Sequence, residues 1–176
     1  MINMIIGPMK SGKTKFLLDL FDKDDSKKVI LIHPGTISER GFLSRDSQVE
    51  IKDEDKIYTD QIDILTLEKY EHVYIPDLHL FKGKSDDLVA LHVLGVKLTV
   101  DLLNGFWDGT ISPWFGLLPF SVVNFRHTLT HCSYCGEPGA YLHLLKIKNA
   151  HPCDTVFPTS DNSYDIVCLK CYFKNN

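Results

Sequence analysis

Residues 7–14, Gly-Pro-Met-Lys-Ser-Gly-Lys-Thr, place two glycines, two lysines and a threonine in one short segment. The apolar run Met4 to Ile6 precedes it, and apolar residues at helical spacing follow it from Phe16 to Phe21. A strand, a glycine-bounded loop ending in Lys-Thr and a helix form a phosphate cradle, because backbone N–H groups and the positive helix end point to one place. The segment therefore predicts a phosphate-binding loop and nucleotide chemistry.

The loop residues have distinct expected roles. Lys13 should reach the β- and γ-phosphates of ATP, and the Thr14 hydroxyl should be a ligand of the Mg²⁺ ion between them. An ordinary strand-to-helix turn that matches by chance is the alternative interpretation. The expected cofactor-binding residues are Gly7, Pro8, Met9, Lys10, Ser11, Gly12, Lys13 and Thr14.

Four of the five cysteines form two C-x-x-C pairs, Cys132/Cys135 and Cys168/Cys171. Four thiolates at this spacing can converge on one tetrahedral Zn²⁺ ion, and a site closed by four cysteines is structural because it leaves no open position. Free thiols or redox cysteines are the alternatives. Cys153 has no such partner, and we expect it to be a plain thiol.

The elements that must position these residues alternate between strand and helix. Apolar runs that end at Pro or Gly are typical of buried parallel strands, and the spacing between them predicts the connecting helices. We expect an α/β fold, a P-loop core with a parallel sheet over residues 1–129 and a small zinc-binding domain over residues 130–176. The expected strands lie at 4–6, 29–33, 49–51, 72–75, 97–101 and 140–147, and the expected helices begin after Gly12 and cover 61–70 and 85–95.

The composition suits a soluble intracellular protein. The chain has 176 residues, 44% of them hydrophobic, and no apolar run approaches the length of a membrane span. The first strand starts without a secretory h-region, so we expect a cytoplasmic location without membrane contact. The net charge of −4 argues against a broad nucleic-acid surface.

The two ends of the chain, with several short motifs between them, resemble one family. The loop at 7–14, the two cysteine pairs and the ending Val167 to Phe173 occur in the same order as in the cellular and poxvirus-type thymidine kinases, which are zinc-containing P-loop enzymes. The motifs between them are Leu103-Asn104-Gly105, Phe115-Gly116 and Ala140-Tyr141.

This resemblance implies a function and a set of partners. The family transfers the γ-phosphoryl group of ATP to the 5′-hydroxyl of thymidine or deoxyuridine, and its members are usually tetramers in which a loop covers the nucleoside. It implies ATP, Mg²⁺ and structural Zn²⁺ as cofactors and a homo-oligomer as the assembly. Arg40 falls at a family arginine, and the implied substrate-binding residues are Met9, Asp46, Phe81, Leu103, Trp107 and Tyr164.

The sequence departs from the family pattern at the end of the central strand. The family has Asp-Glu-x-Gln-Phe, in which Asp organises magnesium and Glu takes the proton, whereas this chain has Pro76-Asp77-Leu78-His79-Leu80-Phe81. Asp77 then becomes the expected general base, with Lys13 as the other catalytic residue. Three candidates could fill the gap: Thr14 and water molecules could hold magnesium alone, His79 could orient the acceptor, or Asp101 could supply the missing carboxylate from the neighbouring strand. Capping by Asp77, a structural role for His79 and a solvated Asp101 are the alternatives.

The expected nucleoside pocket also differs. Trp107 falls where the family stacks an aromatic ring on thymine, although core packing would explain it equally well. The family's Ala-Tyr-Thr-x-Arg reads Ala140 to Leu144 here, and its Gly-Gly lid segment is replaced around Pro158 to Ser160. Substrate preference can therefore differ from that of the family.

Three functional hypotheses follow from the sequence. The first is a thymidine or related deoxynucleoside kinase. The second is a pseudokinase that binds a nucleotide but is impaired in catalysis and has a regulatory or structural role. The third is an ATPase whose zinc module binds nucleic acid, against which the net negative charge counts.

Overall fold

The computed structural model describes residues 1–9, 11–34, 49–106, 110–126, 131–138, 142–145 and 164–175, with the backbone alone at 142–145, 164 and 175. The elements that it contains are β1 (Ile2–Gly7), α1 (Lys13–Asp22), β2 (Lys28–Ile32), β3 (Lys56–Tyr58), α2 (Ile64–Leu67), β4 (His72–Ile75), α3 (Ser85–Val93), β5 (Lys97–Leu103), β6 (Ser121–Phe125), β7 (Leu142–Leu145), β8 (Tyr164–Val167) and α4 (Leu169–Asn175), with 3₁₀ helices η2 (Asp53–Asp55), η3 (Leu78–Leu80) and η4 (Pro113–Phe120).

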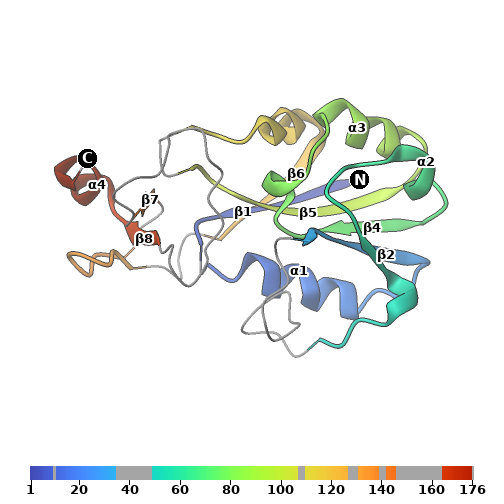
Figure 1. The fold of residues 1–176 in the computed structure, drawn as a ribbon, viewed down its shortest axis with the longest axis horizontal. Helices are drawn as coiled ribbons and strands as arrows, with labels where there is room; N and C mark the ends of the chain where they lie inside the picture. Colours follow the sequence, from blue (N-terminus) through green and yellow to red (C-terminus); the bar gives the residue numbers. More distant parts are fainter. Residues whose placement is uncertain are drawn as a thin grey trace.

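A six-stranded parallel sheet forms the centre of the molecule (Figure 1). Its strand order is β3-β2-β4-β5-β1-β6, and every neighbouring pair is parallel. The sheet confirms the α/β class that the alternating pattern predicts. Because parallel sheets carry ligands at the carboxyl ends of their strands, the edge to which β1, β4 and β5 point is the edge of interest.

Helices cover both faces of this sheet. In Figure 1, α1 lies on one face, whereas α3 lies on the other. Alternate residues of β1 follow this arrangement, since Ile5 packs with Leu17 of α1, whereas Met4 and Ile6 belong to the core that contains Leu88 of α3. Burial on both faces explains why the strands read as continuous apolar runs in the sequence.

A second, smaller sheet lies beyond the carboxyl ends of the strands of the main sheet (Figure 1). Strands β7 and β8 pair in antiparallel register, with Leu142 opposite Val167, and α4 follows directly after β8. Of the strand predicted at 140–147, residues 142–145 are a strand and the others lie outside the described residues.

A buried polar network ties the amino ends of β4 and β5 to the chain after α1. Asp24 Oδ2 lies 2.7 Å from Nδ1 of His72 and accepts a 2.8 Å hydrogen bond from the hydroxyl of Tyr74. Nε2 of His72 lies 2.9 Å from the Thr99 hydroxyl. Burial outweighs the attraction to Asp24 and lowers the pKa of His72, so we infer a neutral imidazole whose Nδ1–H donates to Asp24. Thr99 is only 1% exposed, so this network holds the strands together and offers no surface hydroxyl.

Two predicted elements are wrong in place or extent. Residues 49–51 are not a strand: Val49 and Ile51 only anchor a loop on the α1 core, and the short edge strand comes later, at β3. The helix predicted at 61–70 shrinks to α2, because the Asp63 side chain accepts the hydrogen bond of the Leu65 N–H and starts the helix there. Apolar residues therefore predict burial more reliably than they predict regular structure.

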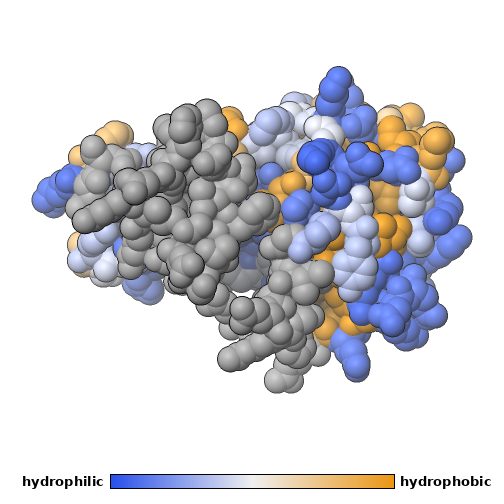
Figure 2. Space-filling view, in the orientation of Figure 1, coloured by the Kyte–Doolittle hydropathy of each residue, from blue (hydrophilic) through white to orange (hydrophobic). Residues whose placement is uncertain are grey.

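The coloured part of the surface in Figure 2 is mixed, with hydrophobic residues interspersed among hydrophilic ones. Single exposed apolar side chains such as Leu65 and Val93 are ordinary for a folded protein. Within the described residues, none of the helices has the length and apolar character needed to cross a bilayer.

Candidate functional site

The carboxyl ends of three adjacent strands bring the predicted site residues to one edge of the sheet. Gly7 ends β1 and lies opposite Leu103, which ends β5. Asp101 precedes Leu103 on β5 and lies opposite Ile5 of β1. Asp77 follows β4, the other neighbour of β5. The expected loop, Asp77, Asp101 and Leu103 therefore share one region, as the sequence predicts.

The segment between β1 and α1 has the backbone of a tight, glycine-dependent turn. Gly12 has φ 77° and ψ 18° at the N-cap of α1, a left-handed conformation that suits glycine. A Cβ on Gly7 would lie 2.7 Å from Ser11 Oγ and 2.8 Å from the Arg126 carbonyl oxygen. Both glycines are therefore required by the local geometry. The loop curls closely on itself at the start of a ten-residue helix, so the helix end is directed at this edge.

Lys13 and Ser11 place buried polar atoms in this loop. The ammonium group of Lys13, a residue that is only 5% exposed, donates a 3.0 Å hydrogen bond to the carbonyl oxygen of Pro8. The hydroxyl of Ser11 is buried and has no hydrogen-bond partner among the described residues. A buried hydroxyl without a partner costs about 1–3 kcal/mol. A ligand that accepts hydrogen bonds, such as a phosphate group, would satisfy both side chains.

Asp101 is a fully buried carboxyl group beside the loop. Its Oδ1 accepts a 3.1 Å hydrogen bond from the backbone N–H of Asp77, whereas its Oδ2 is buried without a partner among the described residues. Burial, followed by the charge of Asp77, raises the pKa of Asp101 to about 7. The Lys13 ammonium and the Thr14 hydroxyl lower the pKa of Asp101. Both groups therefore lie close to this carboxyl group. The alternative of a solvated Asp101 is excluded.

Asp77 has an unusual backbone. Its φ of 49° and ψ of 45° are left-handed, and it is the one residue other than glycine with positive φ in the described part of the chain. Aspartate tolerates this region better than most residues, and such conformations cluster at functional sites. Its side chain makes no capping hydrogen bond to η3, so a role as a helix cap does not explain it.

Arg126 is a residue near the loop that the sequence analysis missed. Its backbone N–H donates a 2.8 Å hydrogen bond to the carbonyl of Ile6, so β6 brings it beside Gly7. Its guanidinium lies 4.2 Å from the centre of the Phe16 ring, and Nε is buried without a hydrogen-bond partner in the described structure. A basic residue directly after the apolar run 121–125 was the available signal.

The structure describes only some of the other predicted substrate residues. Phe81 is 5% exposed and belongs to the core, in edge contact with the ring of His33. The ring of His79 lies 6.0 Å from that of Phe106, directly before Trp107. For Tyr164 the structure gives only the backbone, at the start of β8. Arg40, Asp46, Trp107, Cys153, Lys10 and the segment around 158–160 lie outside the described residues.

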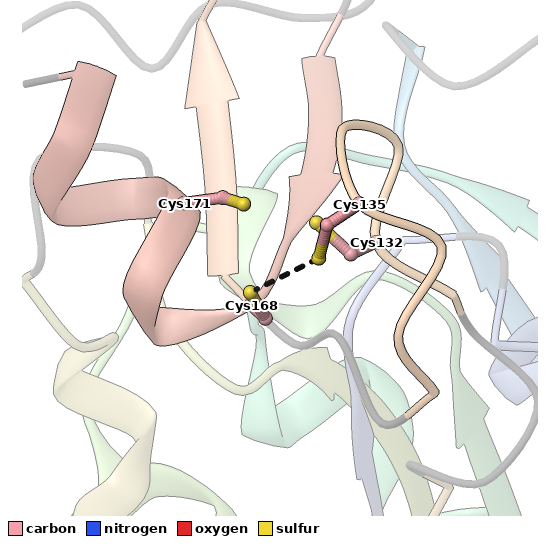
Figure 3. Close-up of side chains that lie close together, drawn as sticks. All are labelled: Cys132, Cys135, Cys168 and Cys171. Atoms are coloured by element: carbon pink, nitrogen blue, oxygen red, sulfur yellow. Dashed lines mark hydrogen bonds between the residues drawn. The ribbon is translucent and has the colours of Figure 1, made fainter.

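The two cysteine pairs converge as their spacing predicts (Figure 3). Cys132 and Cys135 lie in the turn before β7, Cys168 follows β8, and Cys171 extends from α4 toward them. All four sulfur atoms lie within 4.8 Å of one another, and Sγ of Cys135 is 3.7 Å from Sγ of Cys168. Four thiolates around one Zn²⁺ at Zn–S distances of about 2.3 Å would be about 3.8 Å apart, so the cluster is suited to a metal ion such as zinc.

Backbone donors favour the thiolate form at one of the four cysteines, Cys132. Burial acts to raise the pKa of Cys132, but the backbone N–H groups of Cys168, Cys135 and Tyr134 outweigh it and lower the pKa to about 6. Burial and the neighbouring thiols raise the pKa of Cys171 to about 12. A metal ion that binds all four sulfurs must therefore displace protons, which makes its binding dependent on pH.

Met9 connects the loop to the cysteine cluster. Met9 packs against the small hydrophobic cluster formed by Cys132, Ile166, Val167 and Cys171. The N–H of Ser133 also donates a 2.8 Å hydrogen bond to the carbonyl of Ile166, which fixes the cysteine turn to β8. A change in the cysteine module can therefore reach the loop at 7–14 through Met9.

Comparison with known protein-family models gives no match for this chain. Comparison with curated proteins gives no match either. The function proposed below accordingly depends on the geometry of the site and on the motifs in the sequence.

Proposed function

We propose that this protein is an ATP-dependent deoxynucleoside kinase of the thymidine kinase type. It transfers the γ-phosphoryl group of ATP to the 5′-hydroxyl of thymidine or a related deoxynucleoside. The observation that carries the proposal is the loop between β1 and α1, with left-handed Gly12, buried Lys13 and the unpartnered Ser11 hydroxyl. These features suit phosphate oxygens, and Asp77 and Asp101 lie at the same edge of the sheet.

Each residue at this edge has a defined role in the proposal. Lys13 exchanges its bond to the Pro8 carbonyl for the β- and γ-phosphates, and the Thr14 hydroxyl serves as a magnesium ligand. Bound Mg²⁺ neutralises the charge of the phosphate oxygens. Asp77 accepts the proton of the attacking hydroxyl. Positioning and charge neutralisation, rather than covalent chemistry by the protein, then supply most of the catalysis.

The cysteine cluster has a structural role in this proposal. Four thiolates close the coordination shell of zinc, so the ion has no open position for a substrate. The module instead holds β8 and α4 in place and supports Met9 beside the loop. The proposed cofactors are ATP, Mg²⁺ and structural Zn²⁺.

A coupled assay of ADP release with thymidine and Mg²⁺-ATP tests this function. Turnover that depends on the nucleoside supports it. If none of the deoxynucleosides raises ADP release above the rate without acceptor, the chain is not a kinase of this type. The natural deoxynucleosides should be tested in parallel, since the residues of the base pocket differ from the family pattern.

A second candidate function is that of a nucleotide-binding pseudokinase. Pro76, which follows β4 directly, has no carboxylate, and Asp101 is fully buried, which opposes its ionisation. Substitution Pro76→Asp separates the two candidates. A large gain in turnover would indicate that the magnesium site of the natural chain is impaired, whereas an active natural chain that gains nothing would eliminate the pseudokinase.

A further inference from the structure

Two carboxylate groups lie at the site edge in the described part of the chain, and they differ in environment. Asp77 is partly exposed and follows Pro76 after the end of β4, whereas Asp101 is fully buried within β5. One carboxylate group cannot both accept the proton of the acceptor and hold a metal ion in place. The buried group is sheltered from bulk solvent, so it is the one suited to a fixed electrostatic role.

The two oxygen atoms of Asp101 have different surroundings. Oδ1 accepts the hydrogen bond of the Asp77 N–H, at 3.1 Å. Oδ2 is buried and accepts no hydrogen bond of good geometry from a described residue, although the Thr14 hydroxyl lies near enough to the carboxyl group to lower its pKa. Buried polar atoms of native proteins are almost always paired, so an unpaired carboxylate oxygen beside a phosphate-type loop indicates a partner that binds later.

The position of this oxygen limits what that partner is. Lys13 and Thr14 lie close enough to Asp101 to influence its protonation, and they are the loop residues expected at the phosphates and the ion. In its ionised form, which burial opposes and the Lys13 ammonium and a bound cation favour, Asp101 repels an anion and attracts a hard divalent cation that keeps several water molecules. The geometry therefore suits Mg²⁺ or one of the water molecules that it carries.

On the basis of the proposed function, we propose that Asp101 is a positioning residue with two tasks. Oδ2 orders the coordination shell of the Mg²⁺ ion that accompanies ATP, and Oδ1 holds the left-handed backbone of Asp77. The carboxylate that Pro76 lacks at the end of β4 is thereby supplied from the neighbouring strand. Ion binding and the placement of the general base are coupled through a single side chain.

Substitution Asp101→Asn separates the two tasks. The amide oxygen can still accept from the Asp77 N–H, but the amide nitrogen cannot serve as a ligand or acceptor for the ion. Titration calorimetry should measure ATP affinity with and without Mg²⁺ for both chains. We expect the natural chain to bind ATP more tightly with Mg²⁺, and D101N to lose about 10- to 100-fold of that enhancement. Its affinity for ATP without Mg²⁺ should be unchanged or higher.

The variant Asp101→Ala removes both tasks and provides a second test if D101N does not fold. D101A should lose the same Mg²⁺ enhancement as D101N. If the melting temperature without ligand shows both variants to be unfolded, a purely structural role would replace our proposal. If a folded variant keeps the full enhancement of the natural chain, Asp101 does not position the ion.

The measurement also separates this inference from the proposed function. A natural chain that binds ATP with a Mg²⁺ enhancement lost in D101N, yet phosphorylates no deoxynucleoside, would overturn the kinase and leave the role of Asp101 intact. A natural chain that fails to bind ATP under any condition would overturn both. A kinase whose D101N variant keeps the Mg²⁺ enhancement would overturn the inference alone.

Discussion

The backbone N–H of Asp77 donates a 3.1 Å hydrogen bond to Oδ1 of Asp101, which joins the carboxyl ends of neighbouring strands β4 and β5. This bond gives the left-handed Asp77 a fixed partner, so its backbone conformation is stabilised by the adjacent strand. Asp101 therefore positions Asp77, the proposed general base, and in our proposal it also orders the Mg²⁺ ion.

Substitution Lys13→Ala should weaken ATP binding by about 10- to 100-fold. The lysine provides a charged donor inside a buried loop, and bonds of this kind contribute about 1.5–3 kcal/mol. Lys15→Ala is a matched control on the same helix, since Lys15 is half-exposed and pairs with Asp19. Calorimetry with ATP should separate the two variants, and equal affinities would show that the phosphates do not contact Lys13.

Substitution Gly7→Ala should lower the free energy of unfolding by about 1–3 kcal/mol, because overpacking forces neighbouring atoms to move. The new Cβ would lie 2.7 Å from Ser11 Oγ and 2.8 Å from a backbone oxygen. Gly105→Ala is the control, since its nearest atom, the Thr110 carbonyl oxygen, is at 3.5 Å. Urea denaturation measures both, and a Gly7 variant as stable as the control would contradict the tight loop.

His72 should make a contribution to the free energy of unfolding that falls as the pH decreases below 6.5, against the opposite contribution of Asp101, whose pKa burial raises to about 7. Burial lowers the pKa of His72 from its ordinary 6.5, so the unfolded chain binds the proton first and is favoured by acid. One such group contributes a slope of at most about 1.4 kcal/mol per pH unit. In His72→Gln this slope should be smaller, although His33, whose pKa is also lowered, keeps part of it.

Asp24 should make the free energy of unfolding depend on pH in a second, more acidic range. Although burial raises its pKa, hydrogen bonds from Ser26 and Tyr74 lower it to about 2, against 3.8 in the ordinary case. Its contribution to stability is complete above pH 3.8 and is lost as the pH falls toward 2. Denaturation curves recorded between pH 7 and pH 2 cover the pH ranges of both His72 and Asp24. Parallel curves for the natural chain and the His72 variant would contradict the neutral buried imidazole.

The purified protein should contain one zinc ion per chain, bound by the four cysteines. Cys171→Ser removes one ligand and should abolish stoichiometric zinc and lower the melting temperature, because the ion stabilises only the folded module. Cys153→Ser should keep the zinc, since Cys153 has no C-x-x-C partner in the sequence and the four clustered cysteines complete a tetrahedral site. Elemental analysis gives the metal content. Full zinc in the Cys171 variant would show that the ion binds elsewhere.

The sequence predicted the features whose chemistry is local. Glycine spacing and the apolar strand before it identified the loop at 7–14, and C-x-x-C spacing identified the cysteines that converge in the structure. Strands buried on both faces were recognisable because their apolar runs end at Pro or Gly. The α/β class could therefore be predicted from the pattern alone, whereas the strands β3 and β6 of this sheet were not predicted.

Features that depend on neighbouring strands could not be predicted in this way. The burial of Asp101 depends on its register opposite Ile5, and the proximity of Arg126 depends on β6 pairing beside β1. For a lone aspartate at the end of an apolar run, the sequence alone does not distinguish a solvated side chain from a fully buried one. Val49 and Ile51 led to a wrong strand prediction, because they pack on the core from a loop and not from a strand.

The most direct test of the central claim is identification of the product made from Mg²⁺-ATP and thymidine. We predict a deoxynucleoside 5′-monophosphate that carries the γ-phosphoryl group of ATP, detected by mass spectrometry with ¹⁸O-labelled ATP. Asp77→Asn should form it about 100-fold more slowly or worse. If the natural chain binds ATP but forms no labelled monophosphate with any deoxynucleoside, the kinase assignment is contradicted.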